Sequence, residues 1–257
     1  MDEILKVRQL TVRFGGLAAV DSVDFSIFRN EIVSLIGPNG AGKTTTFNAI
    51  TGFVTPAGTI EFEGQVLKNR RPHQVAEKGI VRTFQITSLF RNLSVLDNVR
   101  TSHHLQEQQT FLGAVLNTRR KQKTENETLS QAMEILEFID LIEEKDRIAS
   151  NLPYGQQRIL EVGIALAVKP KLLLLDEPSA GLNDTETREM MHLINRMRDK
   201  GITILLVEHD MKLVMGISDR IVVLNFGKKI AEGTPDQIKS NPDVIKAYLG
   251  ERRDVKN

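Results

Sequence analysis

A chain of 257 residues, 40% of them hydrophobic, is long enough to bury the core of one large α/β domain, and one domain is expected rather than two. The 34 basic and 33 acidic residues leave a net charge of +1, which excludes a global field that attracts nucleic acid or anionic lipid. Cysteine is absent from the sequence, which excludes disulfides, thiolate metal sites and a cysteine nucleophile and agrees with a reducing cytoplasm.

The first residues and the longest apolar runs indicate where in the cell the protein is expected to lie. The chain begins Met1-Asp2-Glu3, and neither a basic segment nor a long apolar core follows, so it does not resemble a secretory signal. The apolar run over 162–168 is among the longest and is far shorter than the ~20 residues that cross a bilayer. We therefore expect a chain that begins in the cytosol and meets a membrane only peripherally.

Two alternating segments near the amino terminus predict an antiparallel pair of strands. Apolar residues recur at near-strand spacing over 7–14 and 20–27, and Gly15-Gly16 between them is typical of a turn. A third strand is expected over 58–64 and can join the same sheet.

The most informative segment, Gly37 to Thr44, follows an apolar strand over 31–36 and matches the phosphate-binding pattern G-x-x-x-x-G-K-[ST]. Glycines let backbone N–H groups turn toward phosphate oxygens, Lys43 supplies a cation for the β and γ phosphates, and the Thr44 hydroxyl can bind Mg²⁺. A helix that begins at about Gly42 directs its positive end at the same anion. A Gly-rich turn without a ligand is the alternative, but the order of strand, turn and helix favours ATP or GTP. The residues expected to contact the nucleotide are Gly37, Pro38, Asn39, Gly40, Ala41, Gly42, Lys43, Thr44 and Thr45.

From about 90 to 167 the spacing of apolar residues becomes helical, which predicts a helical insertion. One buried helix face is predicted to contain Leu129, Ala132, Met133 and Leu136. The basic run over 119–123 is interpreted as a solvated helix end or loop, and a patch for lipid or nucleic acid is the less favoured alternative.

The last third of the chain predicts a parallel sheet. Its short, unalternating apolar runs over 172–175, 202–207 and 221–224 are typical of strands covered on both faces. Between the first two, Asn183 and Glu186 form the sequence of a helix cap, and Gly201 ends the helix. The buried stripe of that helix is predicted to be Met190, Leu193, Ile194 and Met197.

Asp176 and Glu177 end the apolar strand that starts at Leu172 and supply the second half of a nucleotidase. Asp176 can bind Mg²⁺ or its water, and Glu177 can polarise the water that attacks the γ-phosphate. For the pair alone, a cap on the next helix is the alternative interpretation. Two further candidates are Gln85, a neutral ligand for Mg²⁺ or water, and His209, whose ring N–H can reach the γ-phosphate; in isolation, each has an ordinary structural interpretation.

Taken in order, these motifs resemble the ATP-binding cassette of ABC transporters over essentially the whole chain. The motifs are the phosphate loop, Gln85, Leu152 to Arg158, Leu172 to Glu177, Ala180 to Asn183 and His209. A narrower resemblance, to the ATPase subunit of branched-chain amino acid importers, is carried by Arg13 to Leu17, Tyr154 to Arg158, Glu208 to Arg220 and Asn241 to Glu251. Urea and lipopolysaccharide systems share part of it.

The resemblance implies an α/β fold of the P-loop NTPase class, with one cassette over 1–257. Its parallel-sheet core would cover about 31–88 and 160–257, with an antiparallel β subdomain over about 1–30 and 56–66. A helical subdomain would be inserted over about 89–159.

It also implies a mechanism in which two cassettes close head to tail around two ATP molecules, with Mg²⁺ as cofactor. Phe14 would stack on adenine with Val20 beside it, Glu177 would be the catalytic base, and His209 the switch histidine. Lys43 and Gln85 would assist catalysis, and Gln85 would also sense the nucleotide. The metal ligands implied are Thr44, Gln85 and Asp176, and the residues offered to the partner's ATP are Tyr154, Gly155 and Gln156.

The partners implied are two transmembrane permease subunits, a second and different cassette, and an extracytoplasmic solute-binding protein, with no nucleic acid. The chain would lie at the cytoplasmic face of the membrane. Ile86, Leu89, Phe90 and Leu93 would receive a permease segment, or they would simply fill the helical core. Alternative functions are urea or amide import, lipopolysaccharide extraction, and a soluble ATPase without a transport role.

Four residues depart from the common cassette pattern. Pro153 and Tyr154 stand where Ser and Gly are usual in the signature, Ile164 replaces an Arg, and Asn183 replaces an Asp. Pro153 lacks both a hydroxyl and an N–H, although proline suits a first helical turn. We therefore predict that the ATP site served by this signature is the weaker of the two.

Overall fold

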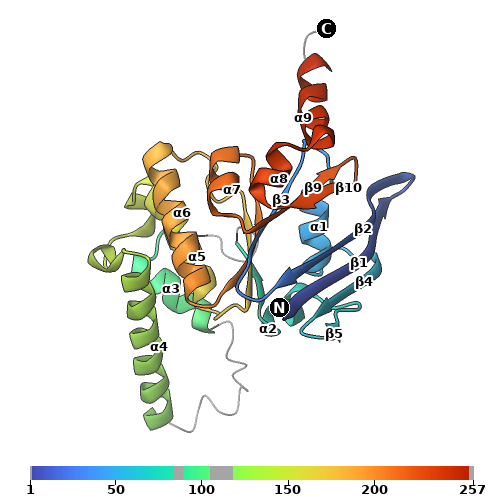
Figure 1. Ribbon diagram of the computed structural model, residues 1–257. Coiled ribbons are helices and arrows are strands. Elements are labelled where there is room, and N and C mark those ends of the chain that lie inside the picture. Colours follow the sequence, from blue (N-terminus) through green and yellow to red (C-terminus); the bar gives the residue numbers. More distant parts are fainter. Residues whose placement is uncertain (1, 84–88, 105–117, 255–257) are drawn as a thin grey trace. The chain divides into compact units, whose positions relative to one another are not determined.

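The computed structural model describes residues 2–83, 89–104 and 118–254 (Figure 1). The chain divides into two compact units. The sheet unit comprises Met1–Val81 and Lys171–Asn257, and the helical unit comprises Arg82–Pro170. The predicted helical subdomain over 89–159 falls inside the helical unit.

An antiparallel sheet of the sheet unit has the strand order β2-β1-β4-β5. Strands β1 (Glu3–Phe14) and β2 (Leu17–Phe28) form the predicted hairpin, and β4 (Ala57–Phe62) pairs with β1 as the predicted third strand. The short β5 (Gln65–Val66) was not predicted, because two exposed residues give no periodic signal.

The second sheet has the order β10-β9-β3-β8-β7-β6. Strand β3 runs parallel to β8 and β9, and β7 runs parallel to β8, which confirms the predicted parallel core. Strand β10 pairs antiparallel with β9 at one edge. The bounds are β3 (Ile32–Ile36), β6 (Ile80–Arg82), β7 (Leu172–Asp176), β8 (Thr203–Val207), β9 (Arg220–Asn225) and β10 (Lys228–Gly233).

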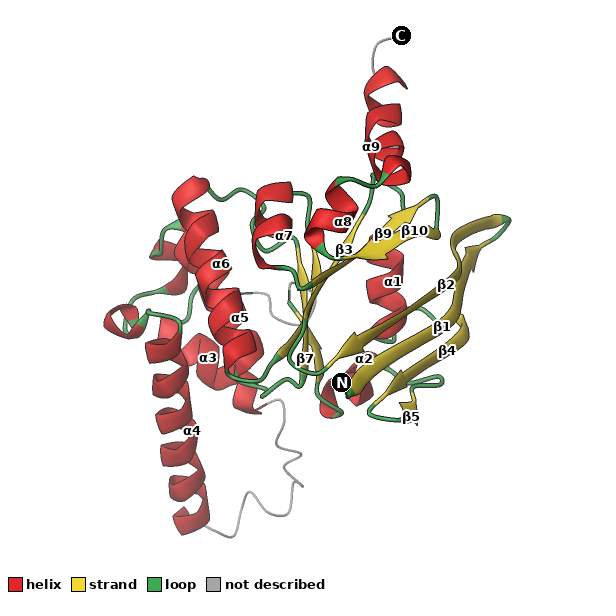
Figure 2. Cartoon of the chain, viewed as in Figure 1, coloured by secondary structure: helices red, strands yellow, loops and turns green. Residues whose placement is uncertain are grey.

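Successive side chains of a strand point to opposite faces of the sheet. Both faces of the parallel sheet are apolar and are covered by other elements. One face, with Val33 and Leu35 of β3, packs on Phe47 of helix α1 (Lys43–Ile50) and on the antiparallel sheet. On the other face Ile36 and Val223 pack under helices of the carboxy-terminal part (Figure 2). Those helices are α7 (Met211–Ile217), α8 (Pro235–Lys239) and α9 (Pro242–Asp254).

Helix α6 (Asp184–Asp199) follows the prediction closely. The Asn183 side chain accepts hydrogen bonds from the N–H groups of Thr185 and Glu186, and the Glu186 carboxylate accepts one from the N–H of Asn183. The predicted stripe of Met190, Leu193, Ile194 and Met197 is buried. The short α2 (Pro72–Glu77) precedes β6 and was not predicted.

The helical unit contains α3 (Val95–His104), α4 (Thr118–Phe138) and α5 (Tyr154–Leu166), with 3-10 turns at Ile142–Glu144 and Ala149–Asn151. In α4 the predicted face is correct for Ala132 and Leu136 but wrong for Leu129, which is 39% exposed. Thr128 is buried in its place. One residue along a helix is a turn of about 100°, so a stripe through Thr128, Ala132 and Leu136 leaves Leu129 outside.

Candidate functional site

Three neighbouring strands of the sheet unit end at the same edge. Leu35 of β3 and Asp176 of β7 both pair with Val207 of β8, which lies between them. The phosphate loop follows β3, Glu177 follows β7, and Glu208-His209 follow β8. The carboxyl edge of a parallel sheet is where α/β folds bind ligands, so the predicted chemistry gathers where the topology favours it.

The phosphate loop is held in place by its neighbours. Gly42 has a φ of 101°, and a Cβ at this position would lie 2.5 Å from the carbonyl oxygen of Ala19. Gly227 of the β9–β10 turn donates its N–H to the carbonyl oxygen of Ala41 at 3.1 Å and accepts from Asp21 N–H at 2.8 Å. The loop therefore lies against β2 and the β9–β10 turn.

Lys43 lies inside this loop at the first residue of α1. Its side chain is buried, and Nζ donates to the carbonyl oxygens of Gly37 at 2.6 Å and Pro38 at 3.0 Å. Thr44 is exposed, and Thr45 is half-buried. The cation is thus held by weak neutral acceptors that an anionic phosphate can replace.

The carboxylates at the end of β7 differ in backbone conformation. Asp176 ends the strand and is half-buried. Glu177 has a φ of 49°, a left-handed conformation that non-glycine residues rarely adopt, and its N–H donates to Val207 O at 2.8 Å. Its Oε1 lies 2.9 Å from His209 Nε2. The structure therefore brings Glu177 and His209 into direct contact.

Other predicted site residues lie elsewhere. Phe14 ends β1 and is 54% exposed, whereas Val20 is fully buried. Gln85 and Ile86 lie outside the described residues. Sequence analysis also passed over a buried carboxylate, Glu208, because a glutamate beside a polar histidine gives no sign of burial.

The signature residues belong to the helical unit and begin α5. Pro153 is the residue before the helix, and its side chain offers no cap. Tyr154 is exposed, and the centre of its ring lies 5.3 Å from the guanidinium carbon of Arg158. Gly155 is buried. The side-chain oxygen of Gln156 is buried and has no hydrogen-bond partner among the described residues.

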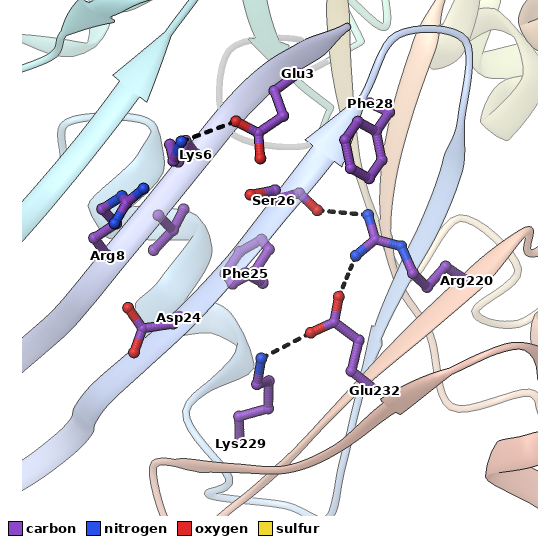
Figure 3. Close-up of a pocket in the computed structure, with 11 residues that line it drawn as sticks. Glu3, Lys6, Arg8, Asp24, Phe25, Ser26, Phe28, Arg220, Lys229 and Glu232 are labelled. Atoms are coloured by element: carbon purple, nitrogen blue, oxygen red, sulfur yellow. Dashed lines mark hydrogen bonds and ion pairs between the residues drawn. The ribbon is translucent and has the colours of Figure 1, made fainter. Parts of the chain in front are cut away.

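A separate polar pocket lies on the outer face of the sheet unit, between β1–β2 and β9–β10, and it shares no residue with the phosphate loop (Figure 3). Arg220 organises it by pairing with Glu31, with Glu232 and with the carbonyl oxygen of Ser26. Hydrogen bonds from Arg220 to Glu31 raise the pKa of Arg220, so this cation stays charged. Because these partners come from both sheets, the network joins them rather than serving the nucleotide.

Comparison with known proteins identifies the family. The model for the family described as ABC transporter matches residues 20–180, and that described as branched-chain amino acid ATP-binding cassette transporter matches residues 228–254. The high-affinity branched-chain amino acid transport ATP-binding protein LivG of Escherichia coli (strain K12) is 50% identical over 250 residues, or 96% of this chain and 98% of LivG. The chain belongs to the LivG family of ABC transporter ATP-binding proteins.

Other relatives of this LivG-family chain agree. The BraF protein of Pseudomonas aeruginosa, with the same transport description, is 47% identical over 96% of this chain and 98% of BraF. The ADP conformation of the ABC transporter cassette MJ1267 has a TM-score of 0.85 and 31% identity, covering 97% of this chain and 100% of that one. These matches confirm the predicted fold, ATP binding, and ATPase activity within a transporter complex.

No helix in the described part of this LivG-family chain has the length and apolar character that crossing a membrane requires.

Proposed function

We propose that the chain hydrolyses ATP to power the import of branched-chain amino acids through separate permease subunits. The observation that carries this proposal is the 50% identity to LivG over 96% of the chain, with a match to the branched-chain family at residues 228–254. Urea import and lipopolysaccharide extraction remain as alternatives that the experiment below separates.

The geometry of the carboxyl edge supports the roles that we propose for the residues gathered there. Backbone N–H groups of the segment from Gly37 to Thr45 bind the phosphates, and Lys43 exchanges its two carbonyl acceptors for phosphate oxygens. Glu177 takes the proton of the attacking water, and His209 steadies both Glu177 and the γ-phosphate. Phe14 supplies an exposed ring for the adenine, and Val20, which is buried, is proposed to pack beside the base.

The residues at this edge fit Mg²⁺. An exposed Thr44 hydroxyl and the Asp176 carboxylate are oxygen donors at one edge of the sheet, with Gln85 proposed as a third ligand. Mg²⁺ normally takes one or two protein ligands and completes its shell with phosphate and water. When bound, the ion would neutralise charge on the phosphates.

Tyr154, Gly155 and Gln156 are proposed to complete the ATP site of a second cassette, with Pro153 making that site the weaker one. The exposed Tyr154 ring supports this role. The complex is proposed to contain a different second cassette, two permeases and an extracytoplasmic solute-binding protein, and the chain to lie at the cytoplasmic face. Exposed Phe90 and Leu93 in the helical unit support permease contact. The same contact is proposed for the half-buried Leu89 and for Ile86, which lies outside the described residues.

The test is to tag the Glu177→Gln variant, which should trap ATP, and identify the proteins that copurify with it from native membranes. Glu189→Gln, on the exposed face of α6, is the matched control. Two multispan permeases and a distinct cassette, together with ATP-driven uptake of leucine in vesicles, would support the proposal. Uptake of urea in place of leucine by the same vesicles would move the assignment to urea import. Lipopolysaccharide-bridge proteins would move it to extraction, and ribosomal proteins alone would contradict transport.

A further inference from the structure

A buried carboxylate lies directly behind the residues proposed for catalysis. Glu208 follows β8 and is only 3% exposed. Its Oε1 accepts hydrogen bonds from the N–H and the hydroxyl of Ser179, both at 2.7 Å. Its Oε2 accepts from the N–H groups of His209 at 2.9 Å and Asp210 at 3.3 Å. One side chain therefore holds two segments of the chain.

The two segments are those that carry Glu177 and His209. Ser179 lies two residues after Glu177, and Ala180 N–H donates to Glu177 O at 3.1 Å, so the segment forms a tight turn. On the other side, Glu208 is bonded to the backbone of the histidine itself. The carboxylate of Glu208 thus links the backbones of both groups while their side chains meet through His209 Nε2 and Glu177 Oε1.

The hydrogen-bond donors around Glu208 favour a carboxylate over an amide of the same size. Within the described residues Glu208 has no cationic partner, and its buried charge is offset by these four donors. All four are donors, and an ionised carboxylate is acceptor-only, whereas the amide of glutamine would turn an NH₂ group toward one pair of them. A Gln at 208 therefore keeps the volume and loses at least one hydrogen bond from a backbone N–H, since only the Ser179 hydroxyl can turn to accept from an amide.

The backbone conformation of Glu177 makes the hydrogen bonds between Glu208 and Ser179 important for the position of Glu177. A non-glycine residue with a φ of 49° keeps that conformation only where its surroundings impose it. Two hydrogen bonds restrain the backbone at Glu177. Its own N–H donates to Val207 O, and the N–H of Ser179, two residues later, donates to Glu208. If the anchor at Ser179 is lost, Glu177 can relax toward ordinary geometry and leave His209.

We infer that Glu208 is a positioning residue for ATP hydrolysis, which fixes Glu177 and His209 relative to each other without touching the nucleotide. This inference rests on the roles proposed above for Glu177 and His209. The catalytic site then includes Glu208, which lies behind the reacting groups. The hydrogen bonds of Glu208 hold the turn over 177–179 and the segment after β8 together.

The experiment compares Glu208→Gln with wild type in the full-length chain, assayed with Mg-ATP at high protein concentration and with the membrane subunits that copurify. The expected result is a fall in kcat of about 10–100-fold, with KM for ATP and the affinity for a fluorescent ATP analogue within about threefold. The ¹⁵N chemical shifts of the His209 ring should also change. Ser179→Ala, which removes one bond of the four, should lower kcat by less and serves if Glu208→Gln fails to fold.

Glu31→Gln, which weakens the Arg220 pair at the opposite end of β3, is the control for a general loss of stability and should leave kcat intact. In a Glu177→Gln background, Glu208→Gln should lower the residual kcat by less than threefold, because a positioning residue acts through the group it positions. Wild-type kcat in both Glu208→Gln and Ser179→Ala, or an additive double variant, would overturn the inference. Full turnover in Glu177→Gln would instead refute the proposed catalytic roles themselves.

Discussion

The Nε2 atom of His209 lies 2.9 Å from Oε1 of Glu177, so the proposed switch and the proposed base are hydrogen-bonded partners. Their side chains are 46% and 45% exposed, which leaves both open to a ligand at the sheet edge. An ionised Glu177 accepts only, so Nε2 carries the proton in this arrangement. To donate that same N–H to a γ-phosphate, His209 must share it with Glu177 or leave it.

Replacing Glu177 by glutamine should stop turnover while ATP still binds. The amide keeps the size and the φ of the residue but cannot take a proton from water, and general-base loss costs about 10²–10⁴-fold in kcat. Steady-state hydrolysis and equilibrium ATP binding measured side by side check this. Equal losses in Glu177→Gln and in the surface control Glu189→Gln would contradict the assignment.

Replacing His209 by alanine should lower kcat by about 10²-fold or more, since both the bond to Glu177 and the contact proposed for the γ-phosphate are lost. Because the two residues act as one unit, the double variant with Glu177→Gln should be hardly slower than Glu177→Gln alone. Single-turnover hydrolysis at saturating ATP is the measurement. A fully additive double variant would show that the two side chains act independently.

Much of this edge could be predicted because the signals are local. Short apolar runs before Gly37 and Asp176 predicted buried strands, and Asn183 with Glu186 predicted the start of α6; the structure confirms all three. Each follows from neighbouring residues: a strand covered on both faces is apolar throughout, and a capping box needs only its own backbone.

What could not be predicted depends on contacts between distant segments. The bond between Glu208 and Ser179 joins residues 29 positions apart, and nothing near Glu208 in the sequence indicates that it is buried. The face of α4 was misplaced at Leu129 because helical spacing fixes a stripe only to within one residue until the neighbouring helices are known. The roles of Gln85 stay predictions.

Two glycines of the phosphate loop should differ when changed to alanine, although both have positive φ. At Gly42, with a φ of 101°, a Cβ would meet Ala19 O at 2.5 Å, whereas at Gly40, with a φ of 75°, nothing lies within 4 Å. Gly40→Ala should lower the free energy of unfolding by about 1–2 kcal/mol, the cost of a left-handed backbone conformation in a residue with a Cβ. Gly42→Ala should lower the free energy of unfolding by about 1–3 kcal/mol more, because the backbone at Ala19 must move away from the new Cβ. Urea unfolding measures both, and equal losses would contradict the close approach.

Glu63 should make stability depend on pH in the acidic range. Hydrogen bonds from Lys171 and then Arg29 lower the pKa of Glu63 below 4.5, so its contribution is present above that value and is lost as pH falls through the folded-state pKa. At neutral pH, Glu63→Gln should cost about 0.5–1 kcal/mol, since both cations are partly exposed. The difference from wild type should shrink below pH 4.5 and in high salt, as measured by denaturant unfolding. A constant difference would contradict the ion pairs.

Phe226 is predicted to destabilise the β9–β10 turn. It is 85% exposed, has a φ of 45°, and with Gly227 forms the two-residue connection between Asn225 and Lys228. Such turns favour Asn-Gly, because asparagine tolerates the left-handed region that costs other residues about 1–2 kcal/mol. Phe226→Asn should therefore raise the unfolding free energy by about 0.5–1 kcal/mol and Tm by a few degrees. Phe226→Ala should gain less, since alanine removes the exposed ring but not the backbone cost; a loss of stability in Phe226→Asn would mean that the ring itself contributes.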